Sequence, residues 1–423
     1  MKRWTLLALA IAIAAAVGVW IWLQAPDRGW TRSQATSSRQ VASAGQIDRG
    51  RYLVTAGDCV ACHTTIGGTP FAGDREVPTP FGSLYSSNLT PDDETGLGQW
   101  NADDFWNALH YGRSRDGRRL YPAFPYTNYT LISREDADAM FAYLRTLKPT
   151  RQTTTPASLR FPYDTQLALR VWRALYFRPA EFRTDASKSE AWNRGAYLVE
   201  GVGHCGACHS GRNWLGGAPK SKQYAGGRIP MLGWDALPLA TETPISDDDA
   251  AELARLLKGG ASKRDVMSGP MAEVVFRSLQ HLDDADIAAM VEYLRSLPHR
   301  EIATESSPYP VPERERKQLA SKGESVYRKH CADCHGEDGQ GKPYAYPALA
   351  GNRLVNAPSP SNAIETMLFG GYGASTALQP QPYGMPPYAN VLSNEEIAAV
   401  LTYVRAAWGN QASAVSPSAV EHH

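Results

Sequence analysis

The chain has 423 residues, and at about 150 residues per domain this length predicts about three domains. Its 43 basic and 43 acidic side chains give a formal net charge of zero, so the basic excess typical of nucleic-acid-binding proteins is missing and we expect no nucleic acid as a partner. A content of 43% hydrophobic and 20% charged residues excludes both a disordered chain and a protein with many membrane spans.

The first expected element is a membrane helix in residues 1–23. From Trp4 to Leu23 the chain carries no charge and is almost wholly apolar, and 20 helical residues span the roughly 30 Å of a bilayer core. A cleaved signal peptide is the alternative, but the run ends in bulky residues where cleavage requires small ones. Lys2 and Arg3 predict a cytoplasmic N-terminus. The sequence therefore predicts an anchor in the cell inner membrane, with the rest of the chain in the periplasm.

All six cysteines occur in three C-x-x-C pairs, each followed directly by a histidine. This is the attachment signature of c-type haem, in which two thiols bind the haem vinyl groups and the histidine is the proximal iron ligand. Zinc sites need a further ligand pair nearby, and dithiol redox motifs do not require the adjacent histidine. The sequence therefore predicts three covalently bound haem c groups. Their residues are Cys59, Cys62 and His63, then Cys205, Cys208 and His209, and then Cys331, Cys334 and His335.

The haem motifs belong to an internal repeat. A short helical pattern precedes each motif, and an amphipathic helix that begins with a capping-box pattern closes each unit. The expected fold is mainly α, with three tandem cytochrome c-like domains after an N-terminal transmembrane helix. The expected boundaries are a tether at 24–45, domains at 46–150, 191–298 and 318–409, linkers at 151–190 and 299–317, and a tail at 410–423.

The sixth iron ligand decides the redox role, because methionine raises the potential and an open position permits catalysis. Met385 lies in a proline-rich loop just before the last helix, and Met271 lies in a Gly-Pro context before the closing helix of the second unit. We expect these two residues to be axial ligands. Met267 is the reserve in the second unit, and packing in the core is the alternative for each methionine.

The first unit departs from this pattern. Its only methionine after the haem motif is Met140, which lies within a helix, and the loop where a ligand is expected has Phe124 at its centre. Phenylalanine cannot ligate iron, so we expect His110 to complete the site, with an open five-coordinate iron as the alternative. His204 and His330 directly precede haem cysteines and are expected to form local hydrogen bonds.

The chain resembles the triheme cytochrome c subunits of bacterial membrane-bound dehydrogenases that oxidise alcohols, aldehydes, gluconate and related sugars. The resemblance covers about residues 46–409. It rests on motifs at residues 57–64, 88–91, 95–98, 116–122, 193–200, 269–274 and 384–387. Members that serve alcohol dehydrogenases commonly carry methionine where this chain has Phe124. The Pro-Ala-Phe-Pro loop with an upstream histidine is more similar to subunits of molybdopterin-containing aldehyde dehydrogenases.

The resemblance implies an electron-transfer subunit of an oxidoreductase complex. Its partners would be a catalytic dehydrogenase subunit, with a small iron–sulfur subunit as a further candidate, and ubiquinone or a terminal oxidase in the membrane. The chain shows no nucleophile or acid–base constellation apart from the haem motifs, so no catalytic residue is expected. The alternatives are a multi-haem peroxidase with an open first haem and a carrier with no fixed partner.

Overall fold

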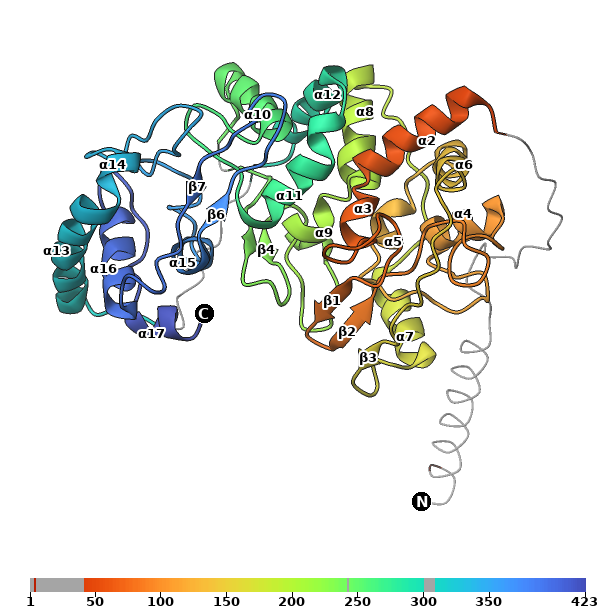
Figure 1. Cartoon of the computed structure of the whole chain (residues 1–423), viewed down its shortest axis with the longest axis horizontal. Coiled ribbons are helices and arrows are strands. Elements are labelled where there is room, and N and C mark those ends of the chain that lie inside the picture. Colours follow the sequence, from red (N-terminus) through yellow and green to blue (C-terminus); the bar gives the residue numbers. More distant parts are fainter. Residues whose placement is uncertain (1–3, 5–41, 242, 300–308) are drawn as a thin grey trace.

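The computed structural model describes Trp4 and residues 42–241, 243–299 and 309–423. Apart from Trp4, the predicted anchor lies outside the described residues, as does most of the predicted tether. Within the described part of the chain, no helix is long and apolar enough to cross a bilayer. The described residues form a mainly helical structure with short strands, as the sequence predicts (Figure 1).

Three crossed helix pairs form the framework. The pairs are α2 (Ala44–Ala56) with α6 (Arg134–Leu144), α8 (Glu190–Ala196) with α12 (Asp284–Arg295), and α13 (Glu313–His330) with α16 (Asn394–Val404). We call them the first, second and third units. A glycine of the first helix makes each crossing possible, because a Cβ at Gly50, Gly195 or Gly323 would lie only 1.8, 1.9 or 2.0 Å from a carbonyl oxygen of the closing helix. The repeat seen in the sequence is therefore a repeat of one packing geometry.

Shorter elements fill the space between the paired helices. The haem motifs lie on single turns at α3 (Cys59–Cys62), α9 (Gly206–His209) and α14 (Ala332–His335). The other helices are α4 (Ala102–Tyr111), α5 (Tyr126–Tyr129), α7 (Gln166–Tyr176), η1 (Tyr197–Val202), η2 (Lys220–Lys222), α10 (Asp247–Gly259), α11 (Gly269–Arg277), η3 (Leu279–His281), α15 (Ser361–Phe369) and α17 (Pro417–Glu421).

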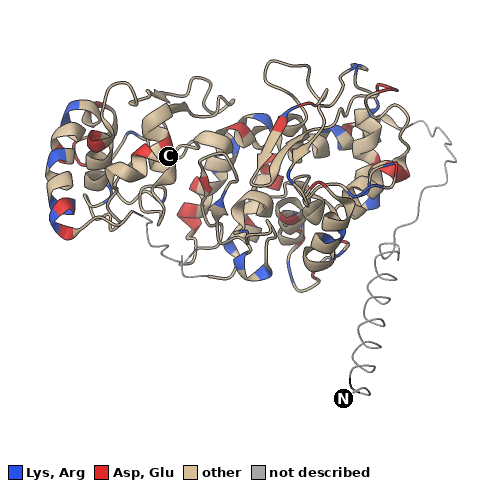
Figure 2. Cartoon of the chain, turned by 90° about the horizontal axis from the view of Figure 1, so that it is seen from below, with Lys and Arg blue, Asp and Glu red and all other residues tan. Residues whose placement is uncertain are grey.

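The strands form small antiparallel sheets. One contains β1 (Glu76–Thr79), β2 (Gly82–Tyr85) and β3 (Ser158–Leu159), and Val77 pairs with Leu84 in its hairpin. Two further sheets pair β4 (Gly227–Arg228) with β5 (Asp235–Ala236) and β6 (Gly371–Tyr372) with β7 (Gly384–Met385). Basic and acidic side chains are interspersed along the helices of all three units (Figure 2).

The first two units share one hydrophobic core, whereas the third unit has its own. Buried residues from Leu53 to Leu297, together with Ala374 from the third unit, form a single cluster. A second cluster extends from Val326 to Val420 and belongs to the third unit alone. The first two units are therefore packed as one body, which the repeat pattern in the sequence did not show.

Reciprocal contacts join the first two units. The hydroxyl of Tyr52 donates to Asp286 and accepts from the backbone N–H of Asp283. In the opposite direction, Tyr197 donates to Asp136 and accepts from the backbone N–H of Ser133. Because equivalent residues exchange equivalent contacts, the two units are related by an approximate two-fold rotation.

The predicted boundaries need three changes. Helix α2 begins inside the predicted tether, and α13 begins at Glu313, inside the second predicted linker. The predicted tail is packed against the third unit, since Val415 and Val420 are buried and Val415 exchanges hydrogen bonds with Thr402. The helix expected in the first linker is present as α7.

Candidate functional site

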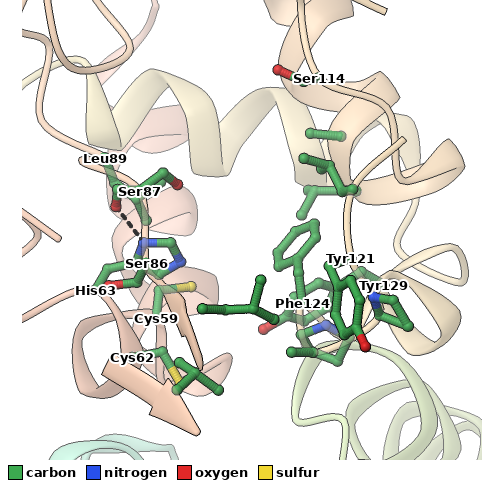
Figure 3. A pocket seen from close by; sticks show the side chains of 18 of the residues that line it. Cys59, Cys62, His63, Ser86, Ser87, Leu89, Ser114, Tyr121, Phe124 and Tyr129 are labelled. Atoms are coloured by element: carbon green, nitrogen blue, oxygen red, sulfur yellow. Dashed lines mark hydrogen bonds between the residues drawn. The ribbon is translucent and has the colours of Figure 1, made fainter. Parts of the chain in front are cut away.

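The three motif histidines have the same hydrogen-bonding arrangement. In each, Nδ1 lies close to a backbone carbonyl oxygen of a loop, at 2.6 Å for His63 and Ser87, 2.7 Å for His209 and Leu237, and 3.0 Å for His335 and Pro347. A carbonyl oxygen can only accept, so Nδ1 carries the proton and the lone pair of Nε2 is free. Metal-binding histidines are typically oriented in this way. Figure 3 shows this contact at His63.

The motif cysteines lie in an environment that is unlike a dithiol redox centre. None of the six is in a disulfide. Burial raises the pKa of the Cys59 thiol to about 12 and that of the Cys331 thiol to about 11. Reactive dithiols and thiolate metal ligands need the opposite shift. Among the residues that the structure describes, no group of three or more His, Cys, Asp or Glu side chains could hold a metal ion.

A large cavity adjoins the first haem motif. Its volume of 3230 Å³ exceeds the roughly 300–1,000 Å³ of ordinary ligand pockets. Cys59, Cys62 and His63 line one side, and Phe124 and Tyr121 lie across the cavity from His63 (Figure 3). The residue types fit haem c, because two thiols and an available imidazole nitrogen meet an apolar, aromatic wall.

The same cavity reaches the second haem motif. Ala207 and Cys208 contribute to its lining, as does His204. The ring of His204 packs edge-on against Tyr129 at 5.3 Å, and the Tyr129 hydroxyl donates to the carbonyl of Gly57, next to the first motif. The attachment turns of the first two units therefore face a common space.

An ion-pair cluster supports this junction, and sequence reasoning missed it. The guanidinium of Arg75 donates to the carbonyl of Ala61, inside the first motif, and pairs with Glu273 of α11 at 3.1 Å. Arg277 also donates to Glu273. Burial alone would raise the pKa of Glu273, but the two arginines outweigh it and lower the pKa. No motif marks Arg75, so only the fold brings it to the haem turn.

A tyrosine holds the attachment turn in two of the units. Tyr129 does so in the first unit, and in the third the Tyr388 hydroxyl donates to the carbonyl of His330 at 2.9 Å. The rings of Tyr388 and His330 also meet edge-on. These local contacts agree with the expectation that His330 is not an iron ligand.

The two predicted methionine ligands lie in partly buried positions. Met271 is in α11 and packs against the shared core, and its helix neighbours Pro270, Glu273 and Val274 line the cavity. Met385 is in β7 and packs against the core of the third unit. Their ligation stays a prediction.

The structure does not place His110 at the cavity. The side of α4 that faces the cavity carries Phe105, Ala108 and Leu109. The His110 ring instead stacks on Trp106, with the ring centroids 4.3 Å apart. Burial lowers the pKa of His110, and the side chain is only 4% exposed. Ligation by His110 would require this packing to change, so it remains a prediction that the geometry does not favour.

Comparison with known proteins identifies the family to which this chain belongs. The cytochrome c family model matches residues 47–148 and 320–408. The gluconate 2-dehydrogenase cytochrome c subunit of Pantoea cypripedii is 34% identical over 91% of this chain and 90% of that protein. The chain belongs to the family of dehydrogenase cytochrome c subunits. Family membership confirms the resemblance seen in the motifs and supports covalently bound haem c.

Other relatives of this cytochrome subunit serve different dehydrogenases. The cytochrome c subunit of a quinone alcohol dehydrogenase from Gluconobacter oxydans is 34% identical over 88% of this chain and 80% of that protein. A nicotinate dehydrogenase subunit from Pseudomonas putida is 39% identical over 86% of this chain, which spans only 30% of that protein. Because the relatives are named for dehydrogenases with different substrates, similarity to them does not identify one substrate.

Proposed function

We propose that this cytochrome subunit holds three haem c groups and passes electrons from a catalytic dehydrogenase subunit to the respiratory chain. The observation that carries the proposal is the repeated histidine geometry, in which His63, His209 and His335 each have Nδ1 fixed by a backbone carbonyl. The family model matches the first and third units only. A haem in the second unit is therefore supported by its own motif and by this shared geometry.

Haem c supplies one-electron redox chemistry when it is bound. The chain itself supplies the thiols, the oriented imidazoles and the apolar walls. For the second and third irons we propose Met271 and Met385 as sixth ligands. The cavity common to the first two motifs would bring their redox groups close together, which is what a relay between neighbouring units requires.

The proposed partner is a periplasmic dehydrogenase subunit that oxidises a small organic substrate. The relatives are named for gluconate, alcohol, fructose and nicotinate dehydrogenases, and the loop around Phe124 adds an aldehyde as a candidate substrate. A small iron–sulfur subunit could complete the complex. Ubiquinone or a terminal oxidase of the inner membrane is the proposed acceptor, and residues 1–23 are the proposed anchor.

Counting haems in the purified full chain tests this proposal. We expect three haems per chain by mass and by absorbance of the pyridine complex. Replacing both cysteines of one motif by alanine should remove one haem and leave two, for each motif in turn. A wild-type chain with two haems would refute the proposal of three haems, and the motif whose variant then loses no haem would be the one that holds none.

Electron transfer is tested with the native complex. A dehydrogenase subunit should co-purify with the chain, and its substrate should reduce all the haems. The peroxidase alternative has no support from the relatives named above. If the substrate left any of the haems oxidised, that result would contradict the relay.

A further inference from the structure

An arginine contacts the haem attachment turn in each of the first two units. In the first unit, the guanidinium of Arg75 donates to the carbonyl of Ala61 at 2.6 Å. In the second unit, the guanidinium of Arg212 donates to the carbonyl of Ala207 at 2.7 Å. Ala61 and Ala207 both lie directly before the second cysteine of their motif. The two arginines therefore contact equivalent carbonyls, and both line the cavity that the two motifs share.

The two arginines reach this carbonyl from different positions in the repeat. Arg75 lies just before β1, 12 residues after the motif histidine, whereas Arg212 follows its motif histidine by three residues. Arg212 also donates to the carbonyl of Gly216 at 2.9 Å, so it joins its own loop to the attachment turn. The internal repeat of the sequence therefore does not account for the shared contact.

The two cations differ in their counter-charge. Glu273 pairs with Arg75, and this hydrogen-bonded carboxylate raises the pKa of the guanidinium. Among the residues that the structure describes, no Asp or Glu forms an ion pair with Arg212, and burial lowers the pKa of its guanidinium. Arginine nevertheless stays protonated in proteins. Arg212 therefore places a positive charge beside the second motif that no carboxylate of the described chain neutralises.

A cation close to a haem favours the reduced state, because reduction adds one electron and lowers the charge of the iron site. A cation that is paired with a carboxylate has a weaker net effect, since the two charges oppose each other. We propose that the charge of Arg212 raises the reduction potential of the second haem, whereas the pair of Arg75 with Glu273 leaves that of the first haem nearly unchanged. This inference rests on the proposed function, because it requires a haem in the second unit.

Redox titration of the full, haem-loaded chain with Arg212→Gln tests the proposal. The potential that belongs to the second haem is the one that disappears in the chain with Cys205→Ala and Cys208→Ala. Glutamine can still donate to a carbonyl but has no charge. The equilibrium constant for reduction of the second haem should therefore fall about tenfold. Arg212→Lys keeps the charge, and its constant should stay within about twofold of the wild-type value.

A second variant leaves Arg212 in place and adds a counter-charge beside it. The side-chain oxygen of Asn213 accepts hydrogen bonds from the backbone N–H groups of Leu215 and Gly217, and an aspartate can accept both. Asn213→Asp should therefore keep the loop and lower the second potential, as Arg212→Gln does. This variant tests the charge even if Arg212→Gln fails to fold.

The ion pair of the first unit provides the matched control. Arg75→Gln combined with Glu273→Gln removes one charge of each sign, so the potential of the first haem should stay in place. That potential is the one that disappears in the chain with Cys59→Ala and Cys62→Ala. A fall as large as that in Arg212→Gln would contradict the neutralisation of Arg75 by Glu273.

The outcomes separate the charge of Arg212 from its hydrogen bonds. A second potential that neither Arg212→Gln nor Asn213→Asp lowers would overturn the proposal. An equal fall in Arg212→Gln and Arg212→Lys would also overturn it, because the arginine would then act through its hydrogen bonds alone. If no potential disappears in the chain with Cys205→Ala and Cys208→Ala, the second unit holds no haem, and the proposal of three haems fails together with this inference.

Discussion

The hydroxyl of Tyr52 donates a hydrogen bond of 2.6 Å to Asp286, across 234 residues of chain. Tyr197 repeats this contact in reverse with Asp136, also at 2.6 Å. In both cases the acceptor is the acidic residue three positions after the helix N-cap, where it would otherwise complete a capping box. The third unit has Ser325 in place of the tyrosine, and there Glu396 completes the capping box with Ser393. The tyrosine therefore distinguishes the two units that pair from the one that does not.

We expect Tyr52→Phe and Tyr197→Phe to destabilise the pairing of the first two units to a similar extent. Each removes a hydrogen bond to a carboxylate and leaves a buried (Asp136) or partly buried (Asp286) acceptor with one partner fewer, at a cost of about 1–2 kcal/mol. Denaturant unfolding of the full chain measures this free energy. Tyr372→Phe is the control, since Tyr372 is 76% exposed, and it should have no effect. Equal stability of wild type and Tyr52→Phe would show that the contact does not contribute.

The Asp286 contact also predicts loss of stability in acid. Burial alone would raise the pKa of Asp286, but hydrogen bonds from Arg194 and Tyr52 outweigh it and lower the pKa below its ordinary value of 3.8. The folded state therefore binds this proton less readily than the unfolded state. Its contribution to stability is present above the unfolded pKa and is lost as the pH falls through the folded pKa.

Unfolding free energies between about pH 3 and pH 6 check this dependence. The wild type should lose more stability on acidification than Asp286→Asn does, because the variant has no carboxylate to protonate. Asp284→Asn on the same helix is the control, since that side chain is 92% exposed. Parallel curves for wild type and Asp286→Asn would contradict the assignment.

The sequence predicted the parts of this protein that depend on local patterns. Cysteine spacing identified the haem turns, and helical periodicity with N-cap residues identified the closing helices. The capping-box pattern places Asp136 and Asp286 three residues after the N-caps of these helices, whereas the structure uses both carboxylates at the interface between units. Contacts between distant segments, such as Arg75 with Glu273, leave no local signal. For His110, a position on a helix likewise does not indicate that the ring will stack on Trp106.

The helix crossings predict which glycines can be replaced. At Gly50 an added Cβ would lie 1.8 Å from the carbonyl oxygen of Ala139, so Gly50→Ala must push α2 and α6 apart at a cost of about 3 kcal/mol. Gly45 on the same helix has no neighbouring atom within 4 Å of the position that a Cβ would take, and Gly45→Ala should stabilise the helix by about 0.5–1 kcal/mol. Thermal unfolding of both variants provides the comparison. Similar melting temperatures would mean that the close crossing is not required.

The proposed sulfur ligand of the third unit is tested by Met385→His. Replacing a methionine ligand by histidine lowers the potential of a haem, so one of the potentials in a redox titration should fall while the others stay in place. The charge-transfer absorption of sulfur-ligated ferric haem should decrease in parallel. Met231→His is the control, because Met231 is 62% exposed. A shift that occurs equally in both variants would argue against Met385 as a ligand.

His110→Ala tests the ligation of the first haem. Because His110 stacks on Trp106 and does not line the cavity, we expect the variant to keep the spin-state populations of the wild type. Loss of the buried ring should instead lower stability by about 2 kcal/mol. Phe124 lies across the cavity from His63 (Figure 3), so Phe124→Met should add a sulfur ligand there and change the spectrum, whereas Phe124→Leu should not. A new high-spin signal in His110→Ala would show that His110 moves to the iron when haem is bound.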